Sequence, residues 1–397
     1  MTGHRTGVEL SMRKREMHPL IDREKQRIAQ QYRRHNRVVS IASFVVLLLG
    51  LFAFLVSGAS NNLAVFAERL SGARAVVILV YFTVLYVAYS AITFPFVYWS
   101  GFVIEHRFGF SLQTFGQWIV DWVKSFLVGF VLGGIVFEVL YLVTRASVHL
   151  WWLWLALFMI VFSVVLANLF PVLILPLFYK TSPLSDSDLK QRIEALCERM
   201  NIPVQGVYSI NLSSKSTKAN AAVAGLGNTK RILLGDTLLA DYSPDETISV
   251  LAHEITHFAE HHTWWLVGIQ SVVTLALFYV FYQVYPVLYG LAGFTHTSEI
   301  AAFPVFAFAF AGLNFVTKPL SAGVSRYFER RADSGALDLT GDADSFIKVM
   351  AKFCNKQLMI AYPHPLIEWY KYSHPSPGNR IRFAEKWQKA QRLSKNC

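Results

Sequence analysis

Six long apolar runs constrain this chain more than any other feature of its sequence. A transmembrane helix needs about 20 largely apolar residues. Lipid offers the backbone no hydrogen bonds, so such runs fold as helices. Only 16% of the residues are charged, against roughly 25% in soluble domains. We therefore predict a mainly α-helical integral membrane protein with spans at Val38–Gly58, Ala75–Val97, Phe126–Val143, Leu150–Leu175, Trp264–Leu291 and Ile300–Thr317.

The basic residues before the first span predict which side of the membrane each polar segment occupies. Ten lysine and arginine residues precede Val38, and cytoplasmic segments carry such an excess. A nucleic-acid-binding arm is an alternative, but a basic stretch beside a span is typical of an anchor on anionic lipid. An even number of spans puts both termini on the same side. We therefore expect both termini in the cytoplasm, membrane lipid as a partner and no nucleic acid.

The spans divide the chain into five predicted parts, of which the longest polar block lies between spans four and five. The topology places this block and the C-terminal segment on the cytoplasmic side, and residues 61–74, 144–149 and 292–299 in loops on the other side. The parts are a basic tail (1–37), a four-span membrane domain (38–179), an α/β block (180–262), spans five and six (263–317) and a C-terminal segment (318–397).

The cytoplasmic block has the patterns of a small α/β domain. Residues 185–200 carry apolar side chains at helical spacing behind acidic residues. Residues 204–212 and 230–236 are rich in β-forming residues. The small residues between them, 213–229, favour a turn and an exposed strand edge. The predicted fold is thus a set of membrane helices with an α/β domain inserted between spans four and five.

The most specific motif is His253-Glu254-x-x-His257, on a helix predicted to begin at a capping box of Ser243 and Glu246. Residues four apart share a helix face, so the two imidazoles can bind one metal ion. Glu254 can reach a water without taking a coordination position, as in zinc peptidases. With 12 histidines and 15 glutamates, chance supplies this motif about 0.014 times per chain. We predict one Zn²⁺ per chain and Glu254 as the general base.

A catalytic zinc needs a third protein ligand. His261 is two helical turns from His253 and cannot easily complete a compact site. Glu329 and Asp333, one turn apart in a helix predicted after the last span, are better candidates. Glu329 would bind the metal, and Asp333 would hold a ligand histidine through its other ring nitrogen. The alternative is an amphipathic surface helix with charges at i and i+4.

The polar tail contains two further candidates, His374 and Arg380, in "YSHPSPGNRIRF". Either could donate a hydrogen bond to the oxyanion that forms at an attacked carbonyl. In a polar tail both could equally be solvated. Glu260 and His261, beside the main motif, are expected in structural or surface positions.

Several ordered blocks resemble the integral-membrane zinc peptidases of the type I CAAX prenyl protease family, which are gluzincins. The resemblance covers about residues 38 to 385, which is most of the chain. The blocks are "FPFVYWSGFVIEHRFGFSLQTF", "LPLFYKTSPLSDSDLKQRIEALCERMNIPVQGVYSIN", "SKSTKANAAVAGLGNTKRILLGDTLL", "AHEITHFAEHH", "SRYFERRAD" and "YSHPSPGNRIRF".

The resemblance implies a role for each matching residue. The family's zinc ligands fall on His253, His257 and Glu329. Its general base falls on Glu254, and its aspartate behind a ligand falls on Asp333. The residues at a strand edge that pairs with substrate backbone fall on Asn220 and Ala221. The tail residues over the substrate fall on His374 and Arg380. His262 matches a further family histidine whose role does not follow from the sequence.

The departures from the family bear on location and substrate. Where eukaryotic members have an additional N-terminal span, this chain has a basic tail, and its form resembles bacterial members. We therefore expect a bacterial inner-membrane protein. Bacteria generally lack protein prenylation, so the substrate stays open between CAAX-type tails, prenylated or not, and misfolded or stalled membrane proteins. Oligomeric state is not predicted, because Gly129 and Gly133 suit either helix association or internal packing.

Two other functions compete with this prediction. A site-2-type intramembrane protease also uses His-Glu-x-x-His, but within a span and with an aspartate ligand, whereas here the motif precedes the fifth span. An inactive scaffold on a protease fold is the second alternative. Degenerate members of that kind usually lose Glu254 or a metal ligand, and this chain keeps all of them.

Overall fold

The computed structural model describes residues 17–224 and 230–395 and is mostly helical. Part of the predicted basic tail (1–16) and part of the small-residue segment (225–229) lie outside the described residues. Among the described residues, six helices are long and apolar enough to cross a membrane. The predicted number of spans is therefore confirmed.

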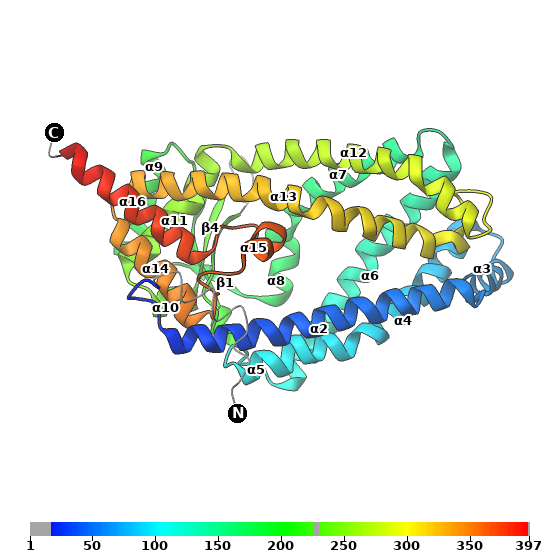
Figure 1. Cartoon of the computed structure of the whole chain (residues 1–397), viewed down its shortest axis with the longest axis horizontal. Helices are drawn as coiled ribbons and strands as arrows, with labels where there is room; N and C mark the ends of the chain where they lie inside the picture. The colour runs from blue at the N-terminus through cyan, green and yellow to red at the C-terminus, as the bar shows by residue number, and fades with distance from the viewer. Residues whose placement is uncertain (1–16, 225–229, 396–397) are drawn as a thin grey trace, which may run out of the picture.

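The spanning helices run along the length of the molecule, and most other elements gather at one end (Figure 1). Turns of π-helix at Trp99–Ile104 and Phe170–Ile174 continue two of the spans into the short helices α5 and α8. The spanning helices are α2 (Arg23–Val56), α4 with α5 (Arg74–Tyr98 and Glu105–Arg107), α6 (Phe115–Ala146), α7 with α8 (Trp151–Leu169 and Leu175–Phe178), α12 (His262–Leu291) and α13 (Phe303–Thr340).

The helices extend well beyond the apolar runs that predict them. α13 continues from the last span, through Pro319, to Thr340. The prediction that Glu329 lies on a separate helix is therefore wrong. Extending a helix costs far less than starting a new one. The predicted loop at 61–74 is also wrong in large part, because it contains α3 (Ala59–Leu70). α3 forms because Ala64 and Ala67 are buried on one of its faces.

A four-stranded sheet lies at the end of the molecule where most of the other elements gather (Figure 1). Its order is β1–β2–β4–β3, with β2 and β4 parallel in the centre and the outer strands antiparallel. The two β-rich sequences form the central strands, and the small-residue segment supplies β3, which lies at the edge as predicted. The strands are β1 (Thr181–Pro183), β2 (Gly206–Ile210), β3 (Ala221–Ala224) and β4 (Arg231–Gly235).

Most of the remaining helices pack around this sheet and against the C-terminal part of α13 (Figure 1). Apart from the short helix at Pro365–Lys371, they share one hydrophobic core with β2 and β4, whereas a second core, rich in aromatic side chains, lies among the spans. These helices are α9 (Ser187–Arg199), α10 (Asp236–Asp241), α11 (Pro244–Ala259), α14 (Ala343–Lys356), α15 (Pro365–Lys371) and α16 (Pro377–Lys395).

The small-residue pair of α6 is used for packing within the chain. A Cβ at Gly129 would lie 2.4 Å from Tyr86 Oη, and one at Gly133 would lie 3.1 Å from the ring of Phe82. Both aromatic residues belong to α4. The two glycines therefore let α4 and α6 approach closely.

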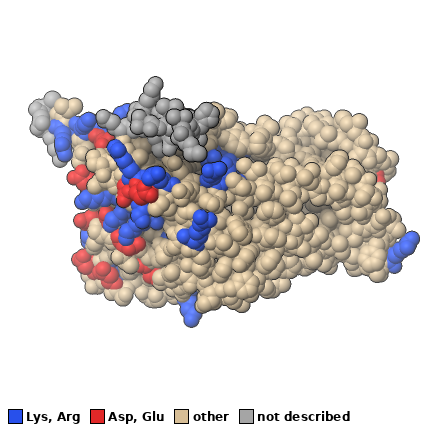
Figure 2. Space-filling view, turned by 60° about the horizontal axis from the view of Figure 1, so that its bottom comes forward, with Lys and Arg blue, Asp and Glu red and all other residues tan. Residues whose placement is uncertain are grey.

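Charge is distributed unevenly along the molecule. Figure 2 shows lysine, arginine, aspartate and glutamate gathered at one end, while most of the remaining visible surface carries none. Many large apolar side chains of the spans are exposed, among them Leu49, Val131, Val161 and Val272. Such an uncharged apolar surface suits lipid and not water, which agrees with a multi-pass membrane protein.

Candidate active site

α11 begins at the predicted capping box. Ser243 Oγ accepts a hydrogen bond from the Glu246 N–H at 3.3 Å, and Glu246 Oε2 accepts one from the Ser243 N–H at 2.7 Å. Leu251, Ala252 and Ile255 are buried in the core that surrounds the sheet. The capped, packed helix is a rigid support for His253 and His257.

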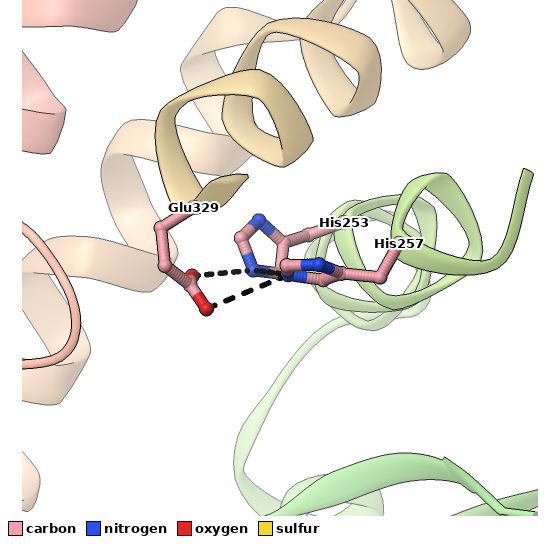
Figure 3. Close-up of side chains that lie close together, drawn as sticks. All are labelled: His253, His257 and Glu329. Atoms are coloured by element: carbon pink, nitrogen blue, oxygen red, sulfur yellow. Dashed lines mark hydrogen bonds and ion pairs between the residues drawn. The ribbon is translucent and has the colours of Figure 1, made fainter. Parts of the chain in front are cut away.

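His253 and His257 of α11 face Glu329 of α13 (Figure 3). His253 Nε2 lies 3.1 Å from Glu329 Oε2, and His257 Nε2 lies 3.5 Å from Glu329 Oε1. The Nε2 atoms of the two histidines are 3.2 Å apart. His253 and Glu329 are buried, and His257 is largely so. The structure thus brings the three predicted metal ligands together, one helical turn of α11 against one residue of α13.

The donor set fits a zinc ion. Two nitrogens bound tetrahedrally at 2.0–2.1 Å from zinc would lie about 3.3 Å apart, close to the observed separation of 3.2 Å. Glu329 Oε2 is buried, and apart from its 3.1 Å contact with His253 Nε2 it has no hydrogen-bond partner among the described residues. A buried oxygen of this kind is costly unless something else satisfies it, and a metal ligand bond would. Two histidines and one carboxylate also leave a position open for water, as catalytic zinc sites do.

A close approach of α11 to α13 sets this geometry. Gly335 lies two residues after Asp333, where a Cβ would be 2.4 Å from Thr256 Cγ2. Thr256 itself is buried in α11. Glycine at this point lets the helix that carries the histidines lie directly on the helix that carries the glutamate.

Asp333 lies behind the first ligand, His253, as predicted from the sequence. Its Oδ1 is 2.9 Å from His253 Nδ1. Arg380 of α16 donates to the same carboxylate from Nε, at 3.2 and 3.0 Å, and from Nη2. Burial lowers the pKa of Arg380, but the adjacent Asp333 carboxylate outweighs it and raises that pKa overall. Arg380 is therefore a buried cation that holds Asp333, and its role toward an oxyanion stays a prediction.

The second ligand, His257, also has an outer partner, whose role did not follow from the sequence. His257 Nδ1 lies 3.1 Å from His262 Nδ1, and His262 Nε2 lies 3.0 Å from Glu260 Oε2. Glu260 also accepts a hydrogen bond from Arg331 Nε at 2.7 Å. Glu260 therefore belongs to the surroundings of the site, whereas His261 is exposed.

Glu254 lies where two cavities of the molecule meet. One cavity, of about 560 Å³, is also lined by His253, His374 and Arg380, and the other, of about 620 Å³, is lined by His257 and apolar side chains of α7 and α12. Burial raises the pKa of the Glu254 carboxyl, and the nearby histidines oppose this shift. Glu254 thus borders both cavities, next to the two histidines.

Asn220 and Ala221 lie beside both cavities as well. Ala221 begins the edge strand β3, whose described pairing is with β4 alone. The Asn220 side chain is exposed, while its carbonyl accepts a hydrogen bond from the Gly235 N–H at 2.8 Å. The free edge of β3 therefore runs past the site that contains Glu254.

His374 lies over the metal-binding group, with its Nε2 3.1 Å from Glu329 Oε1 and half of its side chain exposed. Two residues fix the tail that carries it. Arg326 Nη1 donates to the carbonyls of Glu368, Trp369 and Tyr372, at 3.1, 3.1 and 2.6 Å. Glu368 accepts hydrogen bonds from the backbone of Ser376 and the side chain of Asn379.

Sequence reasoning left the roles of four supporting residues unassigned, which are His262, Glu260, Arg331 and Arg326. The only signal for them was indirect. Glu260 and His262 follow the main motif closely, and Arg326 and Arg331 flank Glu329 in an arginine-rich helix. The partners of these residues depend on how α11 and α15 pack against α13, which no local pattern encodes.

The chain matches two family descriptions along its length. Residues 183–388 match peptidase family M48. Residues 10–180 match the family described as CAAX prenyl protease N-terminal, five membrane helices. In that second range the described residues hold four helices long enough to span a membrane, since α3 is too short.

Individual relatives cover most of the chain. It is 31% identical to a protein of Bacillus subtilis named uncharacterized metalloprotease YhfN, over 91% of this chain and 86% of that protein. It is 34% identical to the CAAX prenyl protease 1 homolog of Arabidopsis thaliana, over 72% and 68%. The crystal structure of S. mikatae Ste24p aligns with a TM-score of 0.83 and 26% identity, covering 92% of this chain and 90% of that one.

Proposed function

Because the chain belongs to peptidase family M48 and is a membrane zinc metalloendopeptidase, we propose which residues carry its reaction and what it cleaves. His253, His257 and Glu329 hold the zinc ion, and Glu254 is the general base. The observation that carries this proposal is the convergence of one buried glutamate and two histidine nitrogens beside a cavity lined by Glu254.

When bound, zinc supplies Lewis-acid activation of water and of the substrate carbonyl. Glu254 accepts the proton of the attacking water and then passes it to the leaving amine. Its partial burial suits this exchange, because a raised pKa brings a carboxyl group closer to neutral pH. His374 reaches over the same group of residues and donates a hydrogen bond to the oxyanion at the attacked carbonyl.

The substrate binds as an added strand on the free edge of β3. Backbone groups of Ala221–Ala224 pair with the extended peptide, as in other cases of β-strand addition. Asn220 lies at the start of this strand and donates from its side-chain amide to the substrate backbone. The two cavities on either side of Glu254 then receive the substrate side chains on the two sides of the cleaved bond.

The active site faces the cytoplasm of a bacterial cell, and the enzyme lies in the inner membrane. The basic segment before the first span supports this orientation. Its substrates are peptides or proteins close to the membrane, either CAAX-type tails, with or without a lipid, or misfolded and stalled membrane proteins. The apolar walls of the larger cavity, from Val164, Phe170 and Trp264, would accommodate an apolar substrate group.

The purified enzyme tests this function on two peptides that differ only in a prenyl group on the cysteine of a CAAX sequence. Each is incubated with the enzyme as prepared, after removal of metal by a chelator, and after return of zinc. We expect cleavage that is lost with the metal and restored with zinc. Cleavage that persists without zinc would refute the assignment. The ratio of the two rates decides whether the lipid is recognised.

A further inference from the structure

His257 ends a chain of hydrogen bonds that runs away from the metal-binding atoms to the protein surface. Its Nε2 faces Glu329, and its Nδ1 faces His262 Nδ1 at 3.1 Å. His262 Nε2 continues to Glu260 Oε2 at 3.0 Å, and Glu260 pairs with Arg331 at 2.7 Å. His262 is buried, with its ring 4.8 Å from that of Phe328, the neighbour of Glu329.

The direction of every hydrogen bond in this chain is determined once His257 binds a metal through Nε2. The Nδ1 of His257 must then carry the proton and donate it. His262 Nδ1 must accept, so His262 is neutral and carries its own proton on Nε2. The His262 Nε2–H donates a hydrogen bond to Glu260, which accepts a second hydrogen bond from Arg331. No two donors or acceptors oppose each other.

The backbone between α11 and α12 places His262 in this position. His261 has φ 55° and ψ 30°, a left-handed conformation that is uncommon for residues other than glycine. This left-handed residue lies between Ala259, the last residue of α11, and His262, the first residue of α12, and it ends the regular course of the helix. The His262 ring then lies against His257 in the C-terminal part of α11.

We propose that His262 is a positioning residue for the zinc site. It fixes the tautomer and the ring orientation of His257 by accepting a hydrogen bond from the His257 Nδ1–H. The two ligand histidines are then supported differently, since His253 donates to the Asp333 carboxylate directly and His257 donates to a carboxylate through a second imidazole. This inference rests on the proposed function of His253, His257 and Glu329 as ligands. Outer partners of this kind typically change metal affinity by 10- to 100-fold.

Two substitutions separate this role from simple filling of space. An asparagine amide oxygen can occupy the place of His262 Nδ1, so His262→Asn retains an acceptor for His257. A glutamine amide reaches the place of Nε2 instead, so His262→Gln retains the contact with Glu260 and fills more volume. His262→Ala retains neither. His261→Asn is the matched control, because it removes an imidazole from the same turn and asparagine tolerates a left-handed conformation.

Zinc affinity of each purified variant is measured by competition with a chelator, and kcat and KM are measured on a cleaved peptide. We expect zinc affinity to fall at least tenfold in His262→Gln and His262→Ala, and less than threefold in His262→Asn and His261→Asn. At saturating zinc, kcat should fall more than KM rises. Equal affinities for the asparagine and glutamine variants, or a higher affinity for glutamine, would overturn the proposal.

Failure of this inference differs from failure of the ligand assignment. Glu329→Ala, measured in the same way, must lose zinc if the proposed function is right. Zinc retained in Glu329→Ala would refute the ligands themselves. Zinc lost in Glu329→Ala but retained at full affinity in His262→Gln would refute only the role of His262. Melting temperatures of the zinc-free variants identify any that do not fold, and the asparagine and glutamine pair then decides.

Discussion

Arg380 holds the carboxylate of Asp333 with its Nε, at 3.2 Å from Oδ1 and 3.0 Å from Oδ2, inside the core where both side chains are buried. Asp333 in turn contacts His253 Nδ1 at 2.9 Å. The last helix of the chain therefore controls the orientation of a histidine about 130 residues earlier. A residue predicted to act on substrate is thus placed to support the metal site from behind.

Removal of Arg380 should destabilise the fold as well as the metal site. Arg380→Met leaves Asp333 buried without its cation, which typically costs about 3–5 kcal/mol. We expect a clearly lower melting temperature and weaker zinc binding than in the parent protein. Arg392→Met, on the exposed part of the same helix, is the control and should change stability by less than about 0.5 kcal/mol. Equal melting temperatures for the two variants would contradict this interpretation.

The close contact between Gly335 and Thr256 should make the site sensitive to a larger residue at position 335. Gly335→Ala places a methyl group 2.4 Å from Thr256 Cγ2 and so pushes α11 away from α13. Overpacking of this kind typically costs about 1–3 kcal/mol, and it should separate the histidines from Glu329 and weaken zinc binding. The double variant Gly335→Ala/Thr256→Ala should recover much of the loss.

The matched control for this prediction is Gly312→Ala in the same helix. A Cβ at Gly312 meets no atom within 4 Å, so this substitution should be tolerated. Zinc content and melting temperature are compared across the set. A Gly335→Ala variant that behaves as Gly312→Ala does would show that the two helices do not need this close approach.

Arg326 should control how firmly the tail lies over the site. Arg326→Gln leaves carbonyls of α15 and Tyr372 without their shared donor, and each lost hydrogen bond to a charged group costs about 1.5–3 kcal/mol. We expect trypsin to cut after Lys371 several times faster, as followed by the mass of the fragment. Arg330→Gln, an exposed arginine of the same helix, should leave this rate unchanged. Identical rates in both variants would argue against the fastening role.

The burial of Cys354 should make the stability of the protein depend on pH in the alkaline range. Burial raises the pKa of its thiol to about 12, from an ordinary value of 9.0. The folded protein therefore keeps this proton while the unfolded chain loses it, so the thiol's contribution to stability is complete below pH 9 and is lost as pH rises through 12. We expect the melting temperature to fall less steeply between pH 9 and 11 in Cys354→Ala than in the parent.

The same burial predicts the reactivity of that thiol. At pH 8.5 the native protein should resist alkylation at Cys354, whereas the unfolded protein should react, as measured by the mass of the peptide that contains it. Rapid alkylation of Cys354 in the folded protein would mean that this part of the core opens readily.

Local patterns account for much of the fold and for the atoms that face the metal. Hydropathy alone identified six spans because lipid forces long apolar runs into helices. Helical spacing placed His253 and His257 on one face, and Ser243 with Glu246 located the start of their helix. Each of these inferences depends on residues a few positions apart.

What local patterns could not supply was the packing between distant segments. The Gly335 contact, the Arg380–Asp333 pair and the Arg326 contacts all join elements far apart in sequence. The left-handed His261 is a different case, because histidine has no strong preference for that conformation. Its φ of 55° could not be predicted from the local sequence, and neither could the position of His262.

We propose that Glu254 moves the proton while His253, His257 and Glu329 hold the zinc. The most direct test measures zinc content and peptide cleavage in the same preparation of Glu254→Gln, which has nearly the same size and shape as the parent. We predict one zinc ion per chain, as in the parent protein, and a rate of cleavage lower by at least about 100-fold. Cleavage at the parental rate with zinc present would contradict the account.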